Sequence, residues 1–100
     1  EMFDTVVAIG LFMFFPRQRA LELLADAQAH VKPNGVAVVN VMIEGTTCMD
    51  MFEPGHYYLF GKTELQERFH GWEVLDFRRD TFNAPGETVK EFTTLIARRL

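Results

Sequence analysis

Two apolar segments separated by a helical one constrain the fold of this chain most. Residues 4–10 contain an uninterrupted apolar run from Val6 to Ile9, and residues 36–43 read Val-Ala-Val-Val-Asn-Val-Met-Ile. Short continuous runs of this kind, rich in β-branched residues, are typical of strands that are buried on both faces of a sheet. A strand, a helix and a second strand in this order predict a βαβ unit with two parallel strands.

The segment between these strands predicts a helix over residues 17–31. Its apolar residues recur at helical spacing and form one stripe, made of Ala20, Leu23, Leu24, Ala27 and Val31. Pro16 suits the first turn, where a missing N–H costs nothing. The sequence Lys-Pro-Asn-Gly at residues 32–35 ends the helix, because lysine complements the helix dipole, proline cannot continue the ladder, and Asn and Gly tolerate positive φ.

The second half of the chain predicts a long loop, a short helix and a hairpin. Residues 44–61 have no clear period, and a segment of this length inside a compact domain is usually a lid or a binding segment. Residues 63–70 read as a helix, and residues 72–79 and 92–97 as strands. The turn sequence Asn-Ala-Pro-Gly at residues 83–86 joins these strands into an antiparallel hairpin.

Two capping boxes compete at the start of the short helix. Thr63 with Gln66 has the spacing of one, and Gly61 with Glu64 has the same spacing two residues earlier. Local sequence leaves both placements open.

Composition and charge exclude several classes of function. The formal net charge is −4, so the chain lacks the basic footprint of a nucleic-acid-binding protein. The longest apolar run, Val6 to Phe15, has ten residues, whereas a membrane span needs about 20. No serine is present, which excludes serine hydrolases. The single cysteine, Cys48, fits a reducing compartment, and we expect a cytoplasmic protein without a signal peptide.

Two apparent motifs, a phosphate-binding loop and a metal site, lack the residue spacing that they require. Residues 55–63 look like a phosphate-binding loop that would suit a nucleotide hydrolase, but five residues separate the glycines where the motif needs four. The three histidines and Cys48 lack metal-ligand spacing, so we expect no metal site. Of the histidines, only His56 lies in the irregular aromatic segment and is a functional candidate.

Four local sequences, in order, match a known family. They are Phe-Asp-Thr-Val-Val at residues 3–7, Val-Lys-Pro-Asn-Gly-Val at 31–36, Phe-Gly-Lys-Thr-Glu-Leu at 60–65 followed by Gly-Trp-Glu-Val at 71–74, and Phe-Thr-Thr-Leu-Ile-Ala-Arg-Arg at 92–99. This order resembles the second half of a class I S-adenosylmethionine-dependent methyltransferase. Within that superfamily, the sequence is most similar to the tellurite-resistance and thiopurine-type methyltransferases.

The resemblance implies an α/β fold, the C-terminal half of a Rossmann-like sheet. Its strands would lie in the order fourth, fifth, seventh, sixth, with the seventh antiparallel and inserted. Residues 1–100 would form the C-terminal part of a single methyltransferase domain, whose N-terminal cofactor-binding half is absent. Accordingly, the chain has no glycine-rich Gly-x-Gly-x-x-Gly loop. It also lacks the His-Arg pair that tellurite-type members often carry in the last hairpin, where residues 82–87 read Phe-Asn-Ala-Pro-Gly-Glu.

The implied activity is methyl transfer from the cofactor S-adenosyl-L-methionine to a small-molecule acceptor, such as a chalcogen oxyanion or a thiol. The chain alone would be inactive. Such an enzyme aligns the acceptor with the methyl group and excludes water, and it needs neither covalent catalysis nor a metal. The alternative is a non-catalytic α/β interaction module. A glycine-rich strand-to-helix turn upstream of these residues would distinguish the two.

Ligands of open parallel sheets bind beyond the carboxyl ends of the strands, which here are residues 9–12 and 44–47. The resemblance places cofactor contacts at Ile9, Gly10, Leu11 and Phe12, although Leu11 and Phe12 could equally be core residues. We expect acceptor contacts at His56, Tyr57 and Tyr58, with the alternative that the tyrosines only cover the strand ends. No residue is assigned a catalytic role.

We also expect the isolated chain to associate with itself. The strand at residues 4–10 has the pattern of an interior strand, and an open apolar edge recruits other chains. Neither nucleic acid nor a membrane is expected as a partner.

Overall fold

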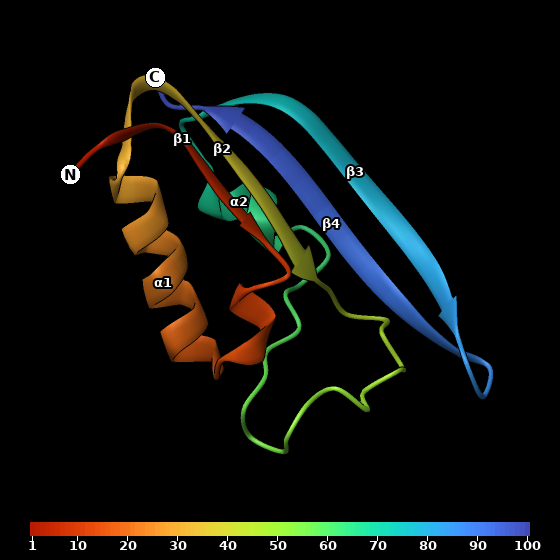
Figure 1. The fold of residues 1–100 in the computed structure, drawn as a ribbon. Coiled ribbons are helices and arrows are strands. Elements are labelled where there is room, and N and C mark those ends of the chain that lie inside the picture. Colours follow the sequence, from red (N-terminus) through yellow and green to blue (C-terminus); the bar gives the residue numbers. More distant parts are fainter.

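A computed structural model describes all 100 residues. The elements follow one another as β1 (Phe3–Ile9), the 3₁₀ helix η1 (Phe12–Phe14), α1 (Arg17–Ala29), β2 (Val31–Met42), α2 (Glu64–Arg68), β3 (Glu73–Ala84) and β4 (Thr88–Arg98) (Figure 1). The residues between β2 and α2 form the long irregular segment that the sequence predicts.

The four strands form one sheet in the order β1-β2-β4-β3. β1 and β2 are parallel, while β4 is antiparallel to both of its neighbours. The predicted strand order is therefore confirmed, including the insertion of the last strand between β2 and β3. The βαβ unit is confirmed as well, because α1 connects the two parallel strands.

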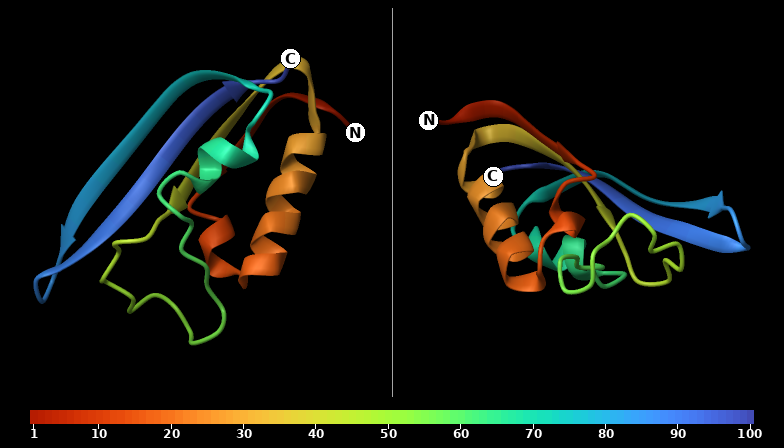
Figure 2. Two further views of the ribbon diagram at one scale, coloured as in Figure 1. Left: turned by 180° about the vertical axis from the view of Figure 1, so that it is seen from behind. Right: turned by 60° about the horizontal axis from the view of Figure 1, so that its bottom comes forward.

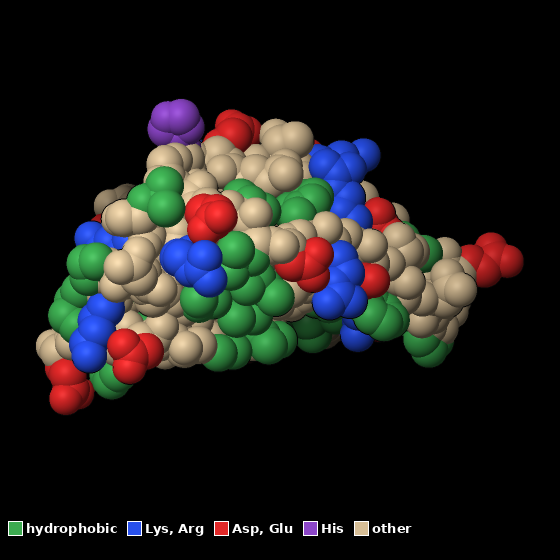
Figure 3. Space-filling view, turned by 90° about the horizontal axis from the view of Figure 1, so that it is seen from above, with side chains coloured by type: hydrophobic (Ala, Val, Ile, Leu, Met, Phe, Trp, Pro, Cys, Tyr) green, Lys and Arg blue, Asp and Glu red, His purple; other side chains and the backbone are tan.

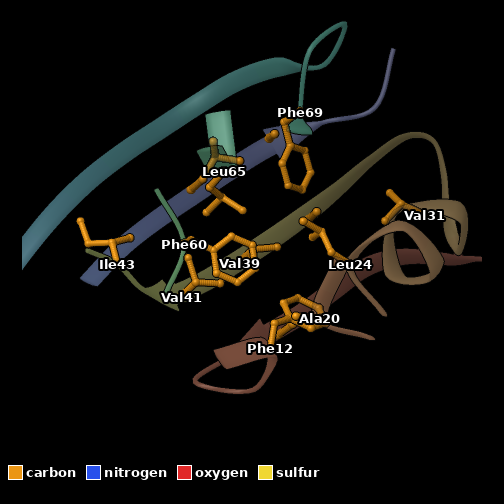
Figure 4. Packing of buried hydrophobic residues seen from close by; sticks show 14 residues of the cluster. Phe12, Ala20, Leu24, Val31, Val39, Val41, Ile43, Phe60, Leu65 and Phe69 are labelled. Atoms are coloured by element: carbon orange, nitrogen blue, oxygen red, sulfur yellow. The ribbon is translucent and has the colours of Figure 1, made fainter. Parts of the chain in front are cut away.

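Both helices, η1 and the long segment cover the same face of the sheet (Figure 2). The core lies between them and the inward side chains of β2 and β4, with Val39, Val41 and Leu95 almost fully buried. Figure 4 shows Phe60 and Phe69 in this layer, together with Leu24 of α1. The helical stripe is confirmed at Ala20 and Leu24, which are buried, while Leu23 and Ala27 pack at its margin.

The opposite face of the sheet carries no helix. Its middle row is apolar, since Val7 pairs with Val38, and Val38 pairs with Ile96. Val7 is 60% exposed. Figure 3 looks onto the upper end of the molecule in Figure 1 and shows hydrophobic side chains between acidic and basic ones. Arg98, two residues from Ile96 on β4, pairs with Glu73 of β3 at 3.0 Å.

Several boundaries differ from the sequence prediction. α1 ends at Ala29 and not at Val31, so the helix ends before the Lys-Pro-Asn-Gly sequence, and Val31 of the predicted helical stripe belongs to β2. β2 begins at Val31, so residues 32–35 form an irregularity inside a strand, where the register with β1 shifts. The hairpin strands are longer than predicted, because pairing continues to Ala84 and Thr88 and leaves only residues 85–87 as the turn. α2 is shorter than residues 63–70, since only Glu64–Arg68 is helical.

Candidate functional site at the carboxyl ends of β1 and β2

The carboxyl ends of the two parallel strands lie at the same edge of the sheet, at the lower end in Figure 1. η1 follows β1 directly, and the long segment follows β2 and runs across this end. The topology therefore brings together the two regions that the sequence predicts on the ligand side.

The turn after β1 has an unusual backbone. Gly10 has a φ of 64°, a left-handed conformation that L side chains rarely adopt. Its N–H donates to the Asn40 carbonyl at 3.2 Å, which ties the turn to β2. A Cβ atom at Gly10 would meet no heavy atom within 4 Å, so the space beside this backbone is open.

The four predicted cofactor residues divide into two groups. Ile9 is 64% exposed and Leu11 is 48% exposed, on either side of Gly10. Phe12 is buried and belongs to the core cluster with Ala20 and Leu24. The open surface thus consists of residues 9–11, while Phe12 holds η1 against the sheet. Whether these residues contact a cofactor stays a prediction.

The long segment starts as an extension of the sheet. The Thr47 and Cys48 N–H groups donate to the Val89 carbonyl at 2.9 and 3.1 Å. The Thr46 hydroxyl accepts a hydrogen bond from the Glu91 N–H at 2.9 Å. These bonds fix the first residues after β2 against β4, so only the later part of the segment is left to form a separate surface.

That later part forms a ladder of three aromatic rings with η1. The rings of Phe14 and Phe52 lie 5.3 Å apart, and those of Phe52 and Tyr57 are stacked at 5.0 Å. These spacings are typical of favourable ring pairs. Phe14 is 45% exposed and Tyr57 is 36% exposed. We call these three residues the aromatic ladder.

Tyr58 makes its contacts outside the aromatic ladder. Its backbone N–H donates to the Met13 carbonyl at 2.9 Å, and its hydroxyl donates to Glu64 Oε1 at 2.6 Å. The same oxygen accepts from the Gly61 N–H at 3.0 Å, so the capping interaction is made by Gly61 and Glu64. The Arg17 guanidinium lies 5.9 Å from the ring centroid.

Burial raises the pKa of the Tyr58 hydroxyl, and its hydrogen bond to Glu64 raises it further. The hydroxyl is therefore protonated at neutral pH and is already committed as a donor. This contact fixes the end of the long segment to α2.

The three predicted acceptor residues therefore have different surroundings. The His56 side chain is exposed, and the backbone N–H of this residue donates to the Glu53 carbonyl at 3.0 Å. Tyr57 is part of the aromatic ladder, and Tyr58 is half-buried against α2. Their role toward an acceptor stays a prediction. The sequence predicts no role for Phe14, because the apolar residues 11–15 fit a continued strand or a packed turn equally well.

Other kinds of site are absent from the described chain. No three His, Cys, Asp or Glu side chains are grouped so that they could hold a metal ion. The 100 residues enclose no pocket. Neither helix has the length and apolar character that crossing a membrane requires.

Comparison with known proteins identifies the family. The family model of the tellurite resistance protein TehB matches residues 1–90. The chain belongs to this family.

Curated relatives match almost the whole chain. "Hemagglutinin 1" of Eikenella corrodens is 27% identical over 108 aligned positions, which cover 99% of this chain and 34% of the relative. A "Probable S-adenosyl-L-methionine-dependent methyltransferase TehB" of Haemophilus influenzae (strain 10810) is 26% identical, covering 99% of this chain and 36% of the relative. The chain thus spans about a third of the length of these relatives.

Solved structures show the same fold. TehB from Haemophilus influenzae superposes with a TM-score of 0.78 at 22% identity, over 100% of this chain and 36% of that one. The N-methyltransferase NodS from Bradyrhizobium japonicum WM9, solved in complex with S-adenosyl-L-homocysteine, gives 0.67 at 13% identity, over 99% of this chain and 47% of that one. The four-stranded sheet is thus shared with methyltransferases of differing sequence.

Proposed function

We propose that these residues are the C-terminal part of an S-adenosyl-L-methionine-dependent methyltransferase domain that acts on a small-molecule acceptor. The match of the TehB family model to residues 1–90 carries this proposal. The N-terminal part of the domain would supply most of the cofactor site, because about two thirds of the length of the curated relatives lies outside the match. The single buried thiol, Cys48, favours a cytoplasmic location.

The residues at the end of β1 fit one wall of a cofactor site. The open space beside Gly10 allows close approach of a ligand to the backbone, and Ile9 and Leu11 offer apolar surface on either side. When bound, S-adenosyl-L-methionine supplies an electrophilic methyl group. In this chain, residues 9–11 would bind and orient the cofactor, while Phe12 keeps η1 in place from the core.

The chain's contribution to the reaction would be positioning and exclusion of water. Tyr57 and His56 lie on the exposed part of the long segment, where they can contact an acceptor. Tyr58 would act as a positioning residue, because its hydroxyl is bonded to Glu64. The acceptor that we propose is a chalcogen oxyanion or a thiol. The alternative function, a non-catalytic α/β interaction module, has no structural observation in its favour.

Cofactor binding by the complete domain tests the proposal. Gly10→Val should weaken S-adenosyl-L-homocysteine binding by about tenfold or more in calorimetry, because the side chain occupies the open space beside the backbone. Gly86→Val is the matched control, since Gly86 also has a positive φ, 76°, and open space around its Cβ position, but lies in the β3–β4 turn. Equal loss of affinity in both variants, or no binding by the parent protein, would overturn the proposal.

Turnover by the complete domain tests the acceptor residues. Alanine at His56 or Tyr57 should lower turnover and leave cofactor affinity largely unchanged. Tyr57→Phe tests the hydroxyl separately from the ring. Wild-type turnover by all of these variants on an established acceptor would assign the segment a structural role only.

We further propose that the isolated chain associates with itself through β1. This strand pairs with β2 alone, and Phe3, Val7 and Ile9 expose apolar side chains along it. An open strand edge with such side chains is a template for pairing with another copy. Light scattering should show dimers or larger species, and Val7→Lys should reduce them. A stable wild-type monomer at high concentration would contradict the proposal.

A further inference from the structure

The long segment between β2 and α2 is fixed at its two ends and not in its middle. At the start, the N–H groups of Thr47 and Cys48 donate to a carbonyl of β4. At the other end, the Tyr58 hydroxyl donates to Glu64 of α2. Residues 49–57 lie between these two attachments and carry two of the predicted acceptor residues.

Apolar packing holds this middle part in place. Residues 49–57 have no backbone hydrogen bond to any helix or strand, because their two backbone bonds, both 3.0 Å long, stay within the stretch. The half-buried ring of Phe52 lies 5.3 Å from that of Phe14 in η1 and stacks on Tyr57. A segment held by so few contacts opens at a low cost in free energy. The placement of His56 and Tyr57 therefore depends on rings, and the Phe14–Phe52 pair is the ring contact that reaches η1.

η1 also reaches the predicted cofactor residues. Leu11 is the residue that precedes its first turn, and the Leu11 carbonyl accepts a hydrogen bond from the Phe14 N–H at 3.2 Å. Phe12 and Met13 are each 2% exposed, so this turn is anchored in the core while Phe14 extends from it toward the long segment. A ligand that packs against Gly10 and Leu11 would fix the same short turn of backbone that carries the Phe14 ring.

We propose that Phe14 is a positioning residue that couples cofactor binding at residues 9–11 to the placement of residues 49–57. The bound cofactor orders η1, and the Phe14 ring then holds Phe52 and Tyr57 at the acceptor side. The inference rests on the proposed function, because it concerns the regulation of that same site. Coupling carried by one ring pair amounts to about two- to tenfold in an equilibrium constant.

Hydrogen exchange of the complete domain tests the coupling without turnover. Saturating S-adenosyl-L-homocysteine should slow amide exchange in residues 49–57 by about two- to tenfold, because it lowers the population in which this stretch is open. Phe14→Ala should abolish the slowing and still bind the ligand in calorimetry. Because coupling between two equilibria is reciprocal, its affinity should fall by about the same factor and no more.

Further variants assign the effect to the ring pair. Phe14→Tyr keeps the ring and should restore the slowing, whereas Phe14→Leu keeps apolar volume without a ring and should not. Phe82→Ala is the matched control and should leave the slowing intact. Phe82 is also an exposed phenylalanine paired with another ring, 5.7 Å from Phe92, but it lies on the β3–β4 hairpin. If Phe14→Ala does not fold, Phe52→Ala breaks the same pair from the other side and should abolish the slowing.

The outcomes separate this inference from the proposed function. Binding of S-adenosyl-L-homocysteine without slower exchange in residues 49–57 would overturn the inference and leave the proposed function standing. Slowing that persists in Phe14→Ala, or that Phe82→Ala also removes, would do the same. A loss of affinity in Phe14→Ala far above the slowing factor would make Phe14 a direct cofactor contact instead. Failure of the wild type to bind the ligand would overturn both.

Discussion

Two glycines at opposite ends of the parallel strands have contrasting surroundings. A Cβ atom at Gly35, at the amino end of the regular part of β2, would lie 2.8 Å from the Asp4 carbonyl oxygen and 2.9 Å from that of Lys32. The same atom at Gly10, at the carboxyl end of β1, would meet nothing within 4 Å. One glycine is required because the backbone is crowded, and the other because its φ is positive.

The difference extends to the polar contacts around each glycine. At the amino end, the Arg99 N–H donates to the Gly35 carbonyl, and the Asn34 N–H donates to the Arg99 carbonyl. Arg99 Nη1 also donates to the carbonyls of Gln28 and Val31, at 3.2 and 2.6 Å. The chain thus closes one end of the sheet with its own backbone. At the other end it leaves an exposed turn and the aromatic ladder.

Gly35→Ala should have the largest effect on stability. Two of the three nearest atoms are backbone oxygens, and the third is Cγ1 of the fully buried Val31, so none of them can move as a flexible side chain can. We therefore expect a loss of about 3 kcal/mol or more in the free energy of unfolding. Urea denaturation of the complete domain measures it. Gly61→Ala is the control, because its nearest contact would be an ordinary 3.5 Å to the Glu64 side chain. A similar loss of stability in both variants would contradict the crowding that we infer around Gly35.

Arg99→Ala should have the next largest effect. It removes a half-buried cation that satisfies two carbonyls at the end of α1 and the start of β2, and hydrogen bonds to charged groups contribute about 1.5–3 kcal/mol. We therefore expect a loss of about 2 kcal/mol in the same denaturation experiment. Arg98→Ala breaks only the exposed ion pair with Glu73 and should cost about 0.5 kcal/mol. Equal costs would show that the amino end is not specially held.

The amino end also shows how far sequence reasoning reaches. The two parallel strands and α1 follow from local apolar patterns, and the position of β4 from the family resemblance. Positive φ at Asn34 also follows from the turn sequence and is confirmed, at 66°. The lysine predicted to complement the α1 dipole instead pairs with Asp4 at 3.7 Å. The residue that serves the helix end is Arg99, 71 positions beyond Gln28, and no local pattern can indicate such a partner.

The sequence predicts the location of the candidate site but not all of its side chains. The ends of two parallel strands specify where the site lies, because strand order alone sets that edge. Which aromatic side chains face solvent depends on contacts between η1 and the long segment. The Phe14–Phe52 pair joins residues with no shared period, so the sequence could not reveal it. The local sequence also could not distinguish the two possible capping boxes of α2. The interaction that forms joins Gly61 and Glu64, and the Tyr58 hydroxyl donates to the same Glu64 oxygen.

Tyr58→Phe should have the smallest effect of the three changes. It removes one hydrogen bond, to Glu64, at the open end of the sheet, and we expect a loss of about 1 kcal/mol at neutral pH. Because the pKa of Tyr58 is raised in the folded state, the folded protein binds this proton more tightly than the unfolded chain does. The stabilisation is therefore complete below pH 10, the ordinary value, and is lost as the pH rises through the higher folded pKa. The stability gap between wild type and variant should narrow above pH 10 in denaturation curves, and a gap that widens there would contradict this role of the hydroxyl.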